Sequence, residues 1–214
     1  MPITSWLHIK DREEILKAAT NAFVVWDFDG VIANSEPIHA ITYQTLLKEF
    51  GVIFQTANFS RFVGLREEDI WETLLSEYGI SSTIEELKNR RRRLFLSLAM
   101  KELHPSWLIL DLTEQIQNVA INQVVLSNGD PETIRSLISH WGLSHRVEYM
   151  PNASGSDKST QLKDLLAKNK KTVVFEDNEK FLQMSKSLGA YTIQVEHAFS
   201  TGGKMDSADV LVRI

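Results

Sequence analysis

Four short apolar runs, separated by segments with helical spacing, constrain the fold more than any other feature of this sequence. The runs are FVVW (23–26), VVL (124–126), TVVF (172–175) and YTIQV (191–195). All except YTIQV lack polar–apolar alternation, as expected for strands that are buried on both faces. Helical patterns fall between them, at 112–120, 131–143, 159–169 and 179–189. This order predicts an α/β fold with a doubly wound parallel sheet that carries helices on both faces.

The alternation of strand and helix stops after the first run. Residues 34–104 contain no convincing strand but several helical patterns. We therefore expect a discontinuous core domain, made of residues 1–33 and 105–214, with an all-helical domain inserted at residues 34–104. The apolar stripe predicted for the first inserted helix consists of Ile38, Ile41, Leu46 and Phe50.

Charge and composition narrow the range of partners and chemistries. The formal net charge of −5 argues against nucleic acid or an anionic membrane as the main partner. The absence of cysteine excludes disulfides, thiol nucleophiles and cysteine-bound metals. The first twenty residues mix acids and bases where a signal peptide needs an apolar centre, and no stretch approaches the roughly 20 apolar residues of a membrane span. We expect a cytoplasmic protein.

Polar side chains follow the predicted strands at the point where each strand ends. In a parallel sheet these ends lie at one edge, where ligands of such folds bind. The candidate site residues at this edge are Asp27, Asp29, Ser127, Asn128, Lys158, Glu176 and Asp177.

Asp27 and Asp29 would leave an extended chain on the same face and repel each other. Clustered carboxylates raise one another's pKa and oppose folding. A hard divalent cation removes this problem. Mg²⁺ prefers oxygen ligands and is commonly held by one or two carboxylates together with a substrate phosphate.

This set of side chains predicts phosphoryl transfer. Asp27 can attack phosphorus and form an aspartyl-phosphate. Asp29 can protonate the leaving oxygen and then accept a proton from the water that hydrolyses the intermediate. Ser127 and backbone N–H groups can hold phosphoryl oxygens, while Lys158 offsets negative charge. Gly30 allows the chain to turn sharply after the two acids.

These segments resemble the motifs of the haloacid dehalogenase-like hydrolases. DFDGVIANSEP looks like the first motif and LSNGD the second, while Lys158 fits the third and FEDNEKF the fourth. NSEPIHAITYQTLLKEFG and RFVGLREEDI are similar to the helical cap of the subgroup that holds β-phosphoglucomutase and phosphoglycolate phosphatase. The resemblance covers nearly the whole chain.

The resemblance implies a Rossmann-like core with a helical cap domain, Asp27 as nucleophile and Asp29 as acid and base. It implies Mg²⁺ bound by the Asp27 side chain, the Asp29 backbone carbonyl and Asp177, with Glu176 as a further candidate ligand. Two features depart from the family pattern. First, Lys158 stands in SDKST and not in the Gly-Lys-Pro context of the family, so Lys163 is a rival candidate for the lysine of the third motif. Second, the segment after HAFST leads us to expect that the last core helix is missing or replaced.

Ser127, Asn128, Lys158 and Arg66 are the candidates for binding the phosphate or the rest of the substrate. Arg66 lies in GLREED of the inserted domain. The arginine run at 90–93 is predicted to be solvated surface, since four consecutive helical residues face all directions. The histidines show no ligand spacing, so most are expected to be packing or surface residues.

The main hypothesis is a Mg²⁺-dependent phosphatase acting on a small phosphorylated metabolite, as a monomer or homodimer. A sugar phosphomutase would use the same acids but return the phosphoryl group to its sugar. A dehalogenase needs neither Asp29 nor a metal cluster. A phospho-acceptor receiver domain is disfavoured, because such domains carry adjacent acids and lack a large helical insert. A catalytically silent binding protein is disfavoured because every side chain required for catalysis is present.

Overall fold

In a computed structural model, the chain is described for residues 9–63, 65–151, 157–197 and 204–214. It divides into two compact units. The core unit contains Met1–Asn34 and His104–Ile214, and the helical unit contains Ser35–Leu103.

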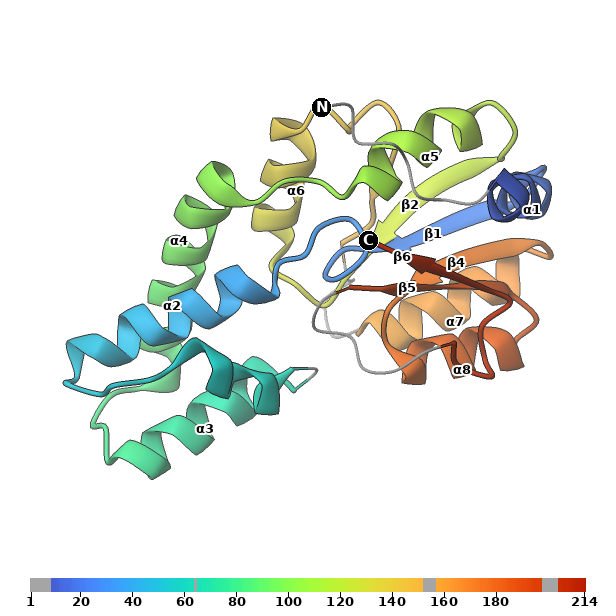
Figure 1. Ribbon diagram of the computed structural model, residues 1–214. Coiled ribbons are helices and arrows are strands. Elements are labelled where there is room, and N and C mark those ends of the chain that lie inside the picture. Colours follow the sequence, from blue (N-terminus) through green and yellow to red (C-terminus); the bar gives the residue numbers. More distant parts are fainter. Residues whose placement is uncertain (1–8, 64, 152–156, 198–203) are drawn as a thin grey trace. The chain divides into compact units, whose positions relative to one another are not determined.

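A six-stranded sheet forms the centre of the core unit (Figure 1). Every pair of neighbouring strands is parallel, in the order β3-β2-β1-β4-β5-β6. The strands are β1 (Phe23–Asp27), β2 (Asn122–Leu126), β3 (Glu148–Tyr149), β4 (Thr172–Glu176), β5 (Tyr191–Glu196) and β6 (Val210–Arg213). β1 lies between β2 and β4, where Val25 pairs with Val124 and Val174. The predicted α/β fold with a parallel sheet is confirmed.

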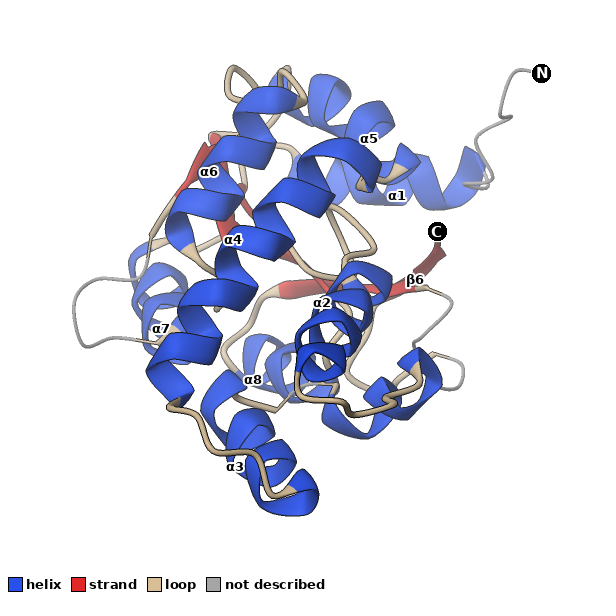
Figure 2. Ribbon diagram, turned by 90° about the vertical axis from the view of Figure 1, so that its left-hand side faces the viewer, coloured by secondary structure: helices blue, strands red, loops and turns tan. Residues whose placement is uncertain are grey.

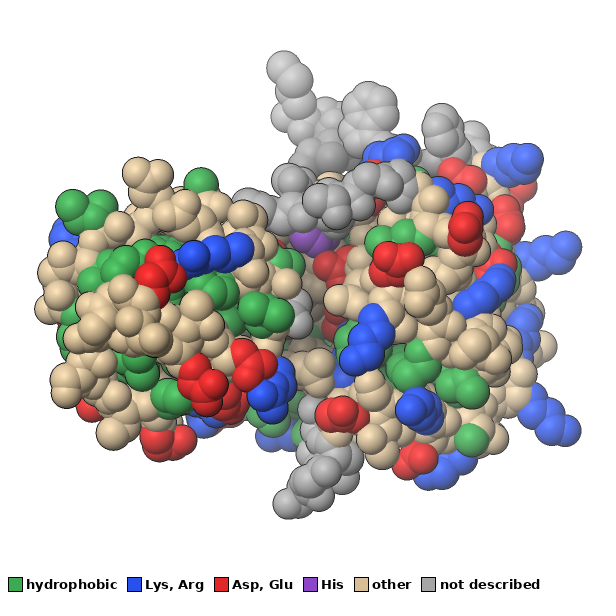
Figure 3. Space-filling model, turned by 90° about the horizontal axis from the view of Figure 1, so that it is seen from below, with side chains coloured by type: hydrophobic (Ala, Val, Ile, Leu, Met, Phe, Trp, Pro, Cys, Tyr) green, Lys and Arg blue, Asp and Glu red, His purple; other side chains and the backbone are tan. Residues whose placement is uncertain are grey.

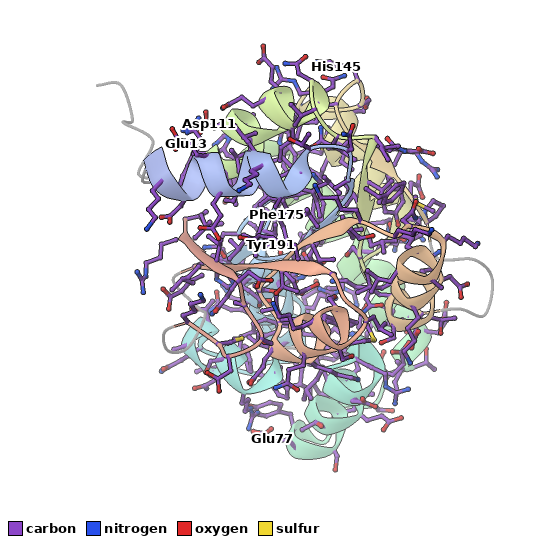
Figure 4. All side chains as sticks on the ribbon, turned by 90° about the vertical axis from the view of Figure 1, so that its right-hand side faces the viewer. Glu13, Glu77, Asp111, His145, Phe175 and Tyr191 are labelled. Carbon is purple, nitrogen blue, oxygen red and sulfur yellow. The ribbon has the colours of Figure 1, made fainter. Side chains whose placement is uncertain are left out.

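Helices cover both faces of the sheet (Figure 1). On one face lie α1 (Ile9–Ala19), α5 (Trp107–Gln117) and α6 (Pro131–His140), and on the other lie α7 (Lys158–Lys168) and α8 (Glu179–Ser187). Figure 4 shows Asp111 of α5 beside α1. Its carboxylate accepts two hydrogen bonds from Arg12, at 3.0 and 2.5 Å, which join these two helices.

Alternation along the central strands assigns each side chain to one face of the sheet. Trp26 stacks on Phe175 with 3.8 Å between ring centroids, inside the core (Figure 4). The indole of Trp26 donates to Gln123, whose amide donates to a backbone carbonyl of α5. Val25 instead packs with Val174 and with leucines of α7. Because Asp27 follows two residues after Val25, its side chain leaves the strand on the α7 side.

Two strands of the sheet were not predicted, and both lie at its edges. β3 has two residues and β6 four. The segment after β5 was predicted to leave the last core helix missing or replaced. In its described part, residues 204–214, the element that forms is the strand β6.

The alternation in YTIQV does not reflect a solvent-exposed face of β5. Thr192 and Gln194 are both buried. Their polar groups are satisfied by the C-terminal segment, since Thr192 Oγ1 donates to the carbonyl of Ser207 at 2.6 Å and Gln194 accepts from the backbone N–H of Met205 at 2.8 Å. β5 is therefore a buried strand with hydrogen-bonded polar side chains.

The described elements of the helical unit are all helices (Figure 2). They are α2 (Glu36–Glu49), the 3₁₀ helix η1 (Thr56–Phe62), α3 (Glu67–Tyr78) and α4 (Ile84–Glu102). Tyr43, Trp71 and Leu87 are fully buried in its own hydrophobic core. The predicted stripe of α2 was partly wrong, because Phe50 follows the end of the helix and is exposed, while Ile41 is only half-buried.

Arg91 corrects the prediction that the arginine run is solvated. Its side chain is only 12% exposed. It pairs with Glu67 of α3 at 2.5 Å, lies 3.0 Å from His39 Nδ1 of α2 and packs over the ring of Tyr43. The face of the molecule in Figure 3 carries basic side chains interspersed with acidic ones, which is typical of a solvated surface.

Candidate active site

The nucleophile candidate Asp27 is the last residue of β1 and is nearly buried, with 7% of its surface exposed. Its Oδ1 accepts a hydrogen bond from the backbone N–H of Phe28 at 2.7 Å. The chain then turns back on itself, because the N–H of Gly30 donates to the carbonyl of Ala33 and Asp29 forms a bridge with Ala33. The turn sets Asp29 beyond the end of the strand.

Lys158 joins two of the predicted acids. It begins α7, and Asp157 before it caps the helix by accepting from the N–H of Thr160. The Lys158 Nζ lies 2.7 Å from Asp27 Oδ1 and 2.7 Å from Glu176 Oε2. All three side chains are buried. Lys163, the rival for this position, is exposed on the same helix.

Burial and like charge make the acids of this group hard to ionise. Burial raises the pKa of Asp27 to about 6, with the charges of Asp177 and Asp29 adding to the effect and that of Lys158 opposing it. Burial also raises the pKa of Glu176, and the neighbouring charge of Asp27 adds to this. Burial alone would lower the pKa of Lys158, but its two carboxylate partners outweigh this and raise it. One ammonium thus faces an excess of negative charge.

Asp27, Glu176 and Asp177 form a carboxylate group that fits a hard cation. Each offers an oxygen, and these oxygens lie within 4.8 Å of one another. Asp177 directly follows the end of β4, next to the end of β1. An all-oxygen donor set with surplus negative charge is the chemistry that Mg²⁺ prefers. The chain can therefore hold such an ion with the residues that the sequence predicted.

Gly30 allows the first motif to pack closely against Asp177. Its φ of +77° lies in the left-handed region that favours glycine. A Cβ at this position would lie 2.3 Å from Asp177 Oδ2, which is too close for a real side chain. Glycine is therefore favoured at this position both by the left-handed backbone conformation and by the close approach of Asp177.

Ser127 and Asn128 follow β2 at the same edge of the sheet. The Ser127 hydroxyl accepts from the backbone N–H of Gly129 at 2.9 Å and lies 3.4 Å from Asp29 Oδ2. The Asn128 side chain accepts from the backbone N–H of Lys158 at 3.2 Å and so positions the start of α7. Asp130 caps α6 by accepting from the N–H of Thr133, so the Ser127 hydroxyl is not used as the cap of this helix.

Arg66 is the one candidate that belongs to the helical unit. It precedes α3 and its side chain is 76% exposed, although it pairs with Asp69 at 2.6 Å. The other candidates belong to the core unit and lie at the carboxyl ends of β1, β2 and β4 or at the start of α7.

Sequence reasoning missed His197. It directly follows β5 and is nearly buried, and its Nε2 lies 2.9 Å from Asp177 Oδ2. A single histidine outside any motif gives no pattern, so the only available signal was its place at the end of a predicted strand.

The described helices include none that is both long and apolar enough to cross a membrane.

Solved structures with similar folds are known for several bacteria. CbbY from Rhodobacter sphaeroides, in complex with phosphate, matches with a TM-score of 0.75 at 16% identity, over 90% of this chain and 93% of that one. A candidate β-phosphoglucomutase from Thermotoga maritima matches with 0.69 at 19% identity, over 90% and 94%. A HAD family hydrolase from Deinococcus radiodurans R1, with bound phosphate and sodium, matches with 0.61 at 16% identity, over 92% of each chain. At these identities the likeness shows a shared fold.

The family model described as haloacid dehalogenase-like hydrolase matches residues 24–195, which is well over half of the chain. The matched region begins one residue after the start of β1 and ends within β5, so it includes the helical unit and the carboxyl ends of β1, β2 and β4. The chain therefore belongs to the haloacid dehalogenase-like hydrolases.

Proposed function

We propose that this protein is a Mg²⁺-dependent phosphatase that hydrolyses a small phosphorylated metabolite through an aspartyl-phosphate on Asp27. The observation that carries the proposal is the buried Lys158, held 2.7 Å from both Asp27 and Glu176, with an Asp177 oxygen within 4.8 Å of theirs. A buried lysine between two acids at a strand end is costly for a purely structural protein. It is useful where a phosphoryl group must approach a carboxylate.

In the first half-reaction an Asp27 oxygen attacks phosphorus, and the bond from phosphorus to the leaving oxygen breaks. Asp29 gives a proton to that leaving oxygen. In the second half-reaction, water attacks the phosphorus while Asp29 takes its proton, and the bond between phosphorus and Asp27 breaks.

Other residues orient these groups. Lys158 fixes the Asp27 carboxylate and offsets charge on the transferring group, while Ser127 and nearby backbone N–H groups donate hydrogen bonds to the phosphoryl oxygens. The proposed Mg²⁺ ligands are the side chains of Asp27 and Asp177 and the backbone carbonyl of Asp29, with Glu176 as a further candidate ligand. Bound Mg²⁺ would neutralise the repulsion between the phosphate and these carboxylates.

We also propose that the helical unit is the cap domain and that it selects the substrate. The family relatives from Rhodobacter sphaeroides and Deinococcus radiodurans bind phosphate, which supports a phosphorylated substrate here. The exposed guanidinium of Arg66 is the proposed contact of the helical unit with that substrate.

The first prediction tests the nucleophile. Purified protein is expected to hydrolyse p-nitrophenyl phosphate with Mg²⁺ and to lose this activity with EDTA. Asp27→Asn should lower the rate by about 10³-fold or more, because an amide cannot form the intermediate. Asp164→Asn, an exposed change on α7, is the matched control and should keep the wild-type rate.

An unchanged rate in Asp27→Asn would contradict the proposal. A panel of sugar phosphates, phosphoglycolate and nucleoside monophosphates would identify the substrate class. Isomerisation of a sugar phosphate that depends on a bisphosphate, without net release of phosphate, would instead indicate a phosphomutase.

A further inference from the structure

His197 contacts the partly exposed member of the carboxylate group. The side chains of Asp27 and Glu176 are 9% and 1% exposed, whereas that of Asp177 is 24% exposed. Of the three carboxylates, that of Asp177 is therefore the least enclosed by protein. The His197 side chain, itself 3% exposed, lies against it with Nε2 at 2.9 Å from Oδ2.

The two residues of this contact come from neighbouring strands of the sheet. β4 and β5 are parallel neighbours in which Glu176 pairs with Gln194. Asp177 and His197 each directly follow the last residue of their strand, so the two side chains meet at the same edge. β5 continues for two residues beyond Gln194, so the imidazole of His197 makes this contact across an offset and not from a directly paired position.

The direction of the hydrogen bond follows from the chemistry of the two groups. An ionised carboxylate can only accept, so Nε2 of His197 carries the hydrogen and donates it to Oδ2. Gly30 packs closely against both groups, because an ideal Cβ at this position would lie 2.3 Å from Asp177 Oδ2 and 2.7 Å from His197 Nε2. Oδ2 of Asp177 is thus held by a histidine N–H within a tightly packed corner.

His197 does not belong to the group that could hold the ion directly. Among the described residues, that group consists of Asp27, Glu176 and Asp177. His197 can act on the ion only through Asp177, in the manner of the hydrogen-bond partners that orient metal ligands in other proteins.

We propose that His197 is a positioning residue that limits Asp177 to one ligand oxygen and thereby makes the site prefer Mg²⁺ to Ca²⁺. The inference rests on the proposed function, since it requires a cation at this site. Mg²⁺ demands near-octahedral geometry with single oxygens at about 2.0–2.1 Å, whereas Ca²⁺ accepts six to eight ligands and often takes both oxygens of a carboxylate. When His197 occupies one oxygen of Asp177, the carboxylate can offer a single oxygen, which favours Mg²⁺ binding and disfavours the two-oxygen binding that Ca²⁺ often uses.

The test compares two substitutions of similar shape, His197→Met without a donor and His197→Gln with an N–H donor. Mg²⁺ and Ca²⁺ are titrated separately into EDTA-stripped protein by calorimetry at one pH. His197→Met should weaken Mg²⁺ binding by about 10–100-fold and Ca²⁺ binding much less, so that the preference for Mg²⁺ falls by about tenfold. His197→Gln should recover most of the preference, and the exposed His140→Leu should match the wild type.

Unchanged affinities and an unchanged Mg²⁺/Ca²⁺ ratio in His197→Met would overturn the inference, as would an equal loss for both ions. Unfolding curves in EDTA show whether each variant is folded. If His197→Met does not fold, His197→Asn replaces it, because its amide is one bond too short to reach Asp177 and the same loss of preference is expected.

Asp177→Asn separates this inference from the proposed function. If Asp177→Asn binds Mg²⁺ as tightly as the wild type, the proposed metal site is wrong. If Asp177→Asn loses Mg²⁺ while His197→Met keeps the wild-type preference, the metal site stands and only the role of His197 is wrong.

Discussion

Lys158 is a residue at which stability and the proposed chemistry depend on the same contacts. Its ammonium is buried between Asp27 and Glu176 and also lies 4.5 Å from the centre of the Phe181 ring. Removing one partner of a buried ion pair leaves the other charge unpaired, which typically costs about 3–5 kcal/mol. The same residue therefore cannot be exchanged for a similar hydrophobic one without loss of folding free energy.

We predict that Lys158→Met lowers the free energy of unfolding in EDTA by about 3–5 kcal/mol, because two carboxylates then lose their shared cation. Urea unfolding measures this change. Lys163→Met on the exposed side of the same helix is the control, with an expected change within about 0.5 kcal/mol. Equal stability of the two variants would show that Lys158 does not stabilise the acids.

At the residue scale, sequence reasoning predicts placement well where a residue is tied to the end of an element. The common edge at which Asp27, Asp29, Ser127, Lys158, Glu176 and Asp177 lie could be predicted, because each ends or follows a strand or begins a helix within a short motif. His197 and Arg91 could not. Each is buried through partners that are distant in sequence, Asp177 for the first and Glu67 and His39 for the second, and such contacts leave no local pattern.

Among the elements, the edge strand β6 depends on a side chain as well as on backbone pairing. Asp209 precedes β6, and its Oδ2 accepts from the backbone N–H of Thr192 at 2.9 Å and lies 3.0 Å from the hydroxyl of the same residue. It also pairs with Lys186 of α8. Burial opposes ionisation of Asp209, but these hydrogen bonds outweigh burial and lower its pKa.

We predict that Asp209→Asn lowers the free energy of unfolding by about 1–2 kcal/mol at pH 7, because a charged acceptor is lost. A carboxyl group whose pKa is lowered by folding stabilises the protein above its unfolded pKa of 3.8, and this contribution disappears as the pH falls through the lower folded value. The difference between the variant and the wild type should therefore shrink below about pH 4. Urea unfolding at pH 7, 4 and 3 measures it, and a difference that stays constant with pH would contradict the ionic explanation.

The elements differ in how well they could be predicted. The central strands β1, β2 and β4 were predicted because apolar runs without polar alternation are typical of strands that are buried on both faces. β3 consists of two residues, Glu148 and Tyr149, which are too few to show an apolar run or a polar–apolar alternation. β6 was missed because its pairing depends on β5 and on Asp209, contacts that the local sequence of VLVR does not indicate.

At the scale of the whole molecule, the proposed function requires two units that the chain builds from interleaved segments. Within the core unit, Ser106 connects the segment that precedes the helical unit with the segment that follows it. Its backbone N–H donates to the carbonyl of Ile32 at 2.7 Å and its hydroxyl donates to that of Val31 at 2.8 Å. The segments that enter and leave the helical unit are thus joined by hydrogen bonds within the core.

We predict that Arg66→Ala raises KM for the natural substrate by about tenfold, because one charge-assisted contact is lost, and leaves kcat for p-nitrophenyl phosphate near the wild-type value. Steady-state kinetics measures both constants. Arg61→Ala, which removes another exposed arginine of the helical unit, is the control. An unchanged KM for every member of the substrate panel would show that Arg66 does not recognise substrate.

The position of β1 at the centre of the sheet has a consequence for synthesis on the ribosome. Val25 emerges early, but its partner Val174 follows about 150 residues later, which at about 5–20 residues per second is on the order of ten seconds. During that interval the helical unit can complete its own core, while the apolar strand FVVW still lacks β4, one of its two neighbours. Nascent chains that end before β4 should therefore be the ones that chaperones hold and that aggregate when released.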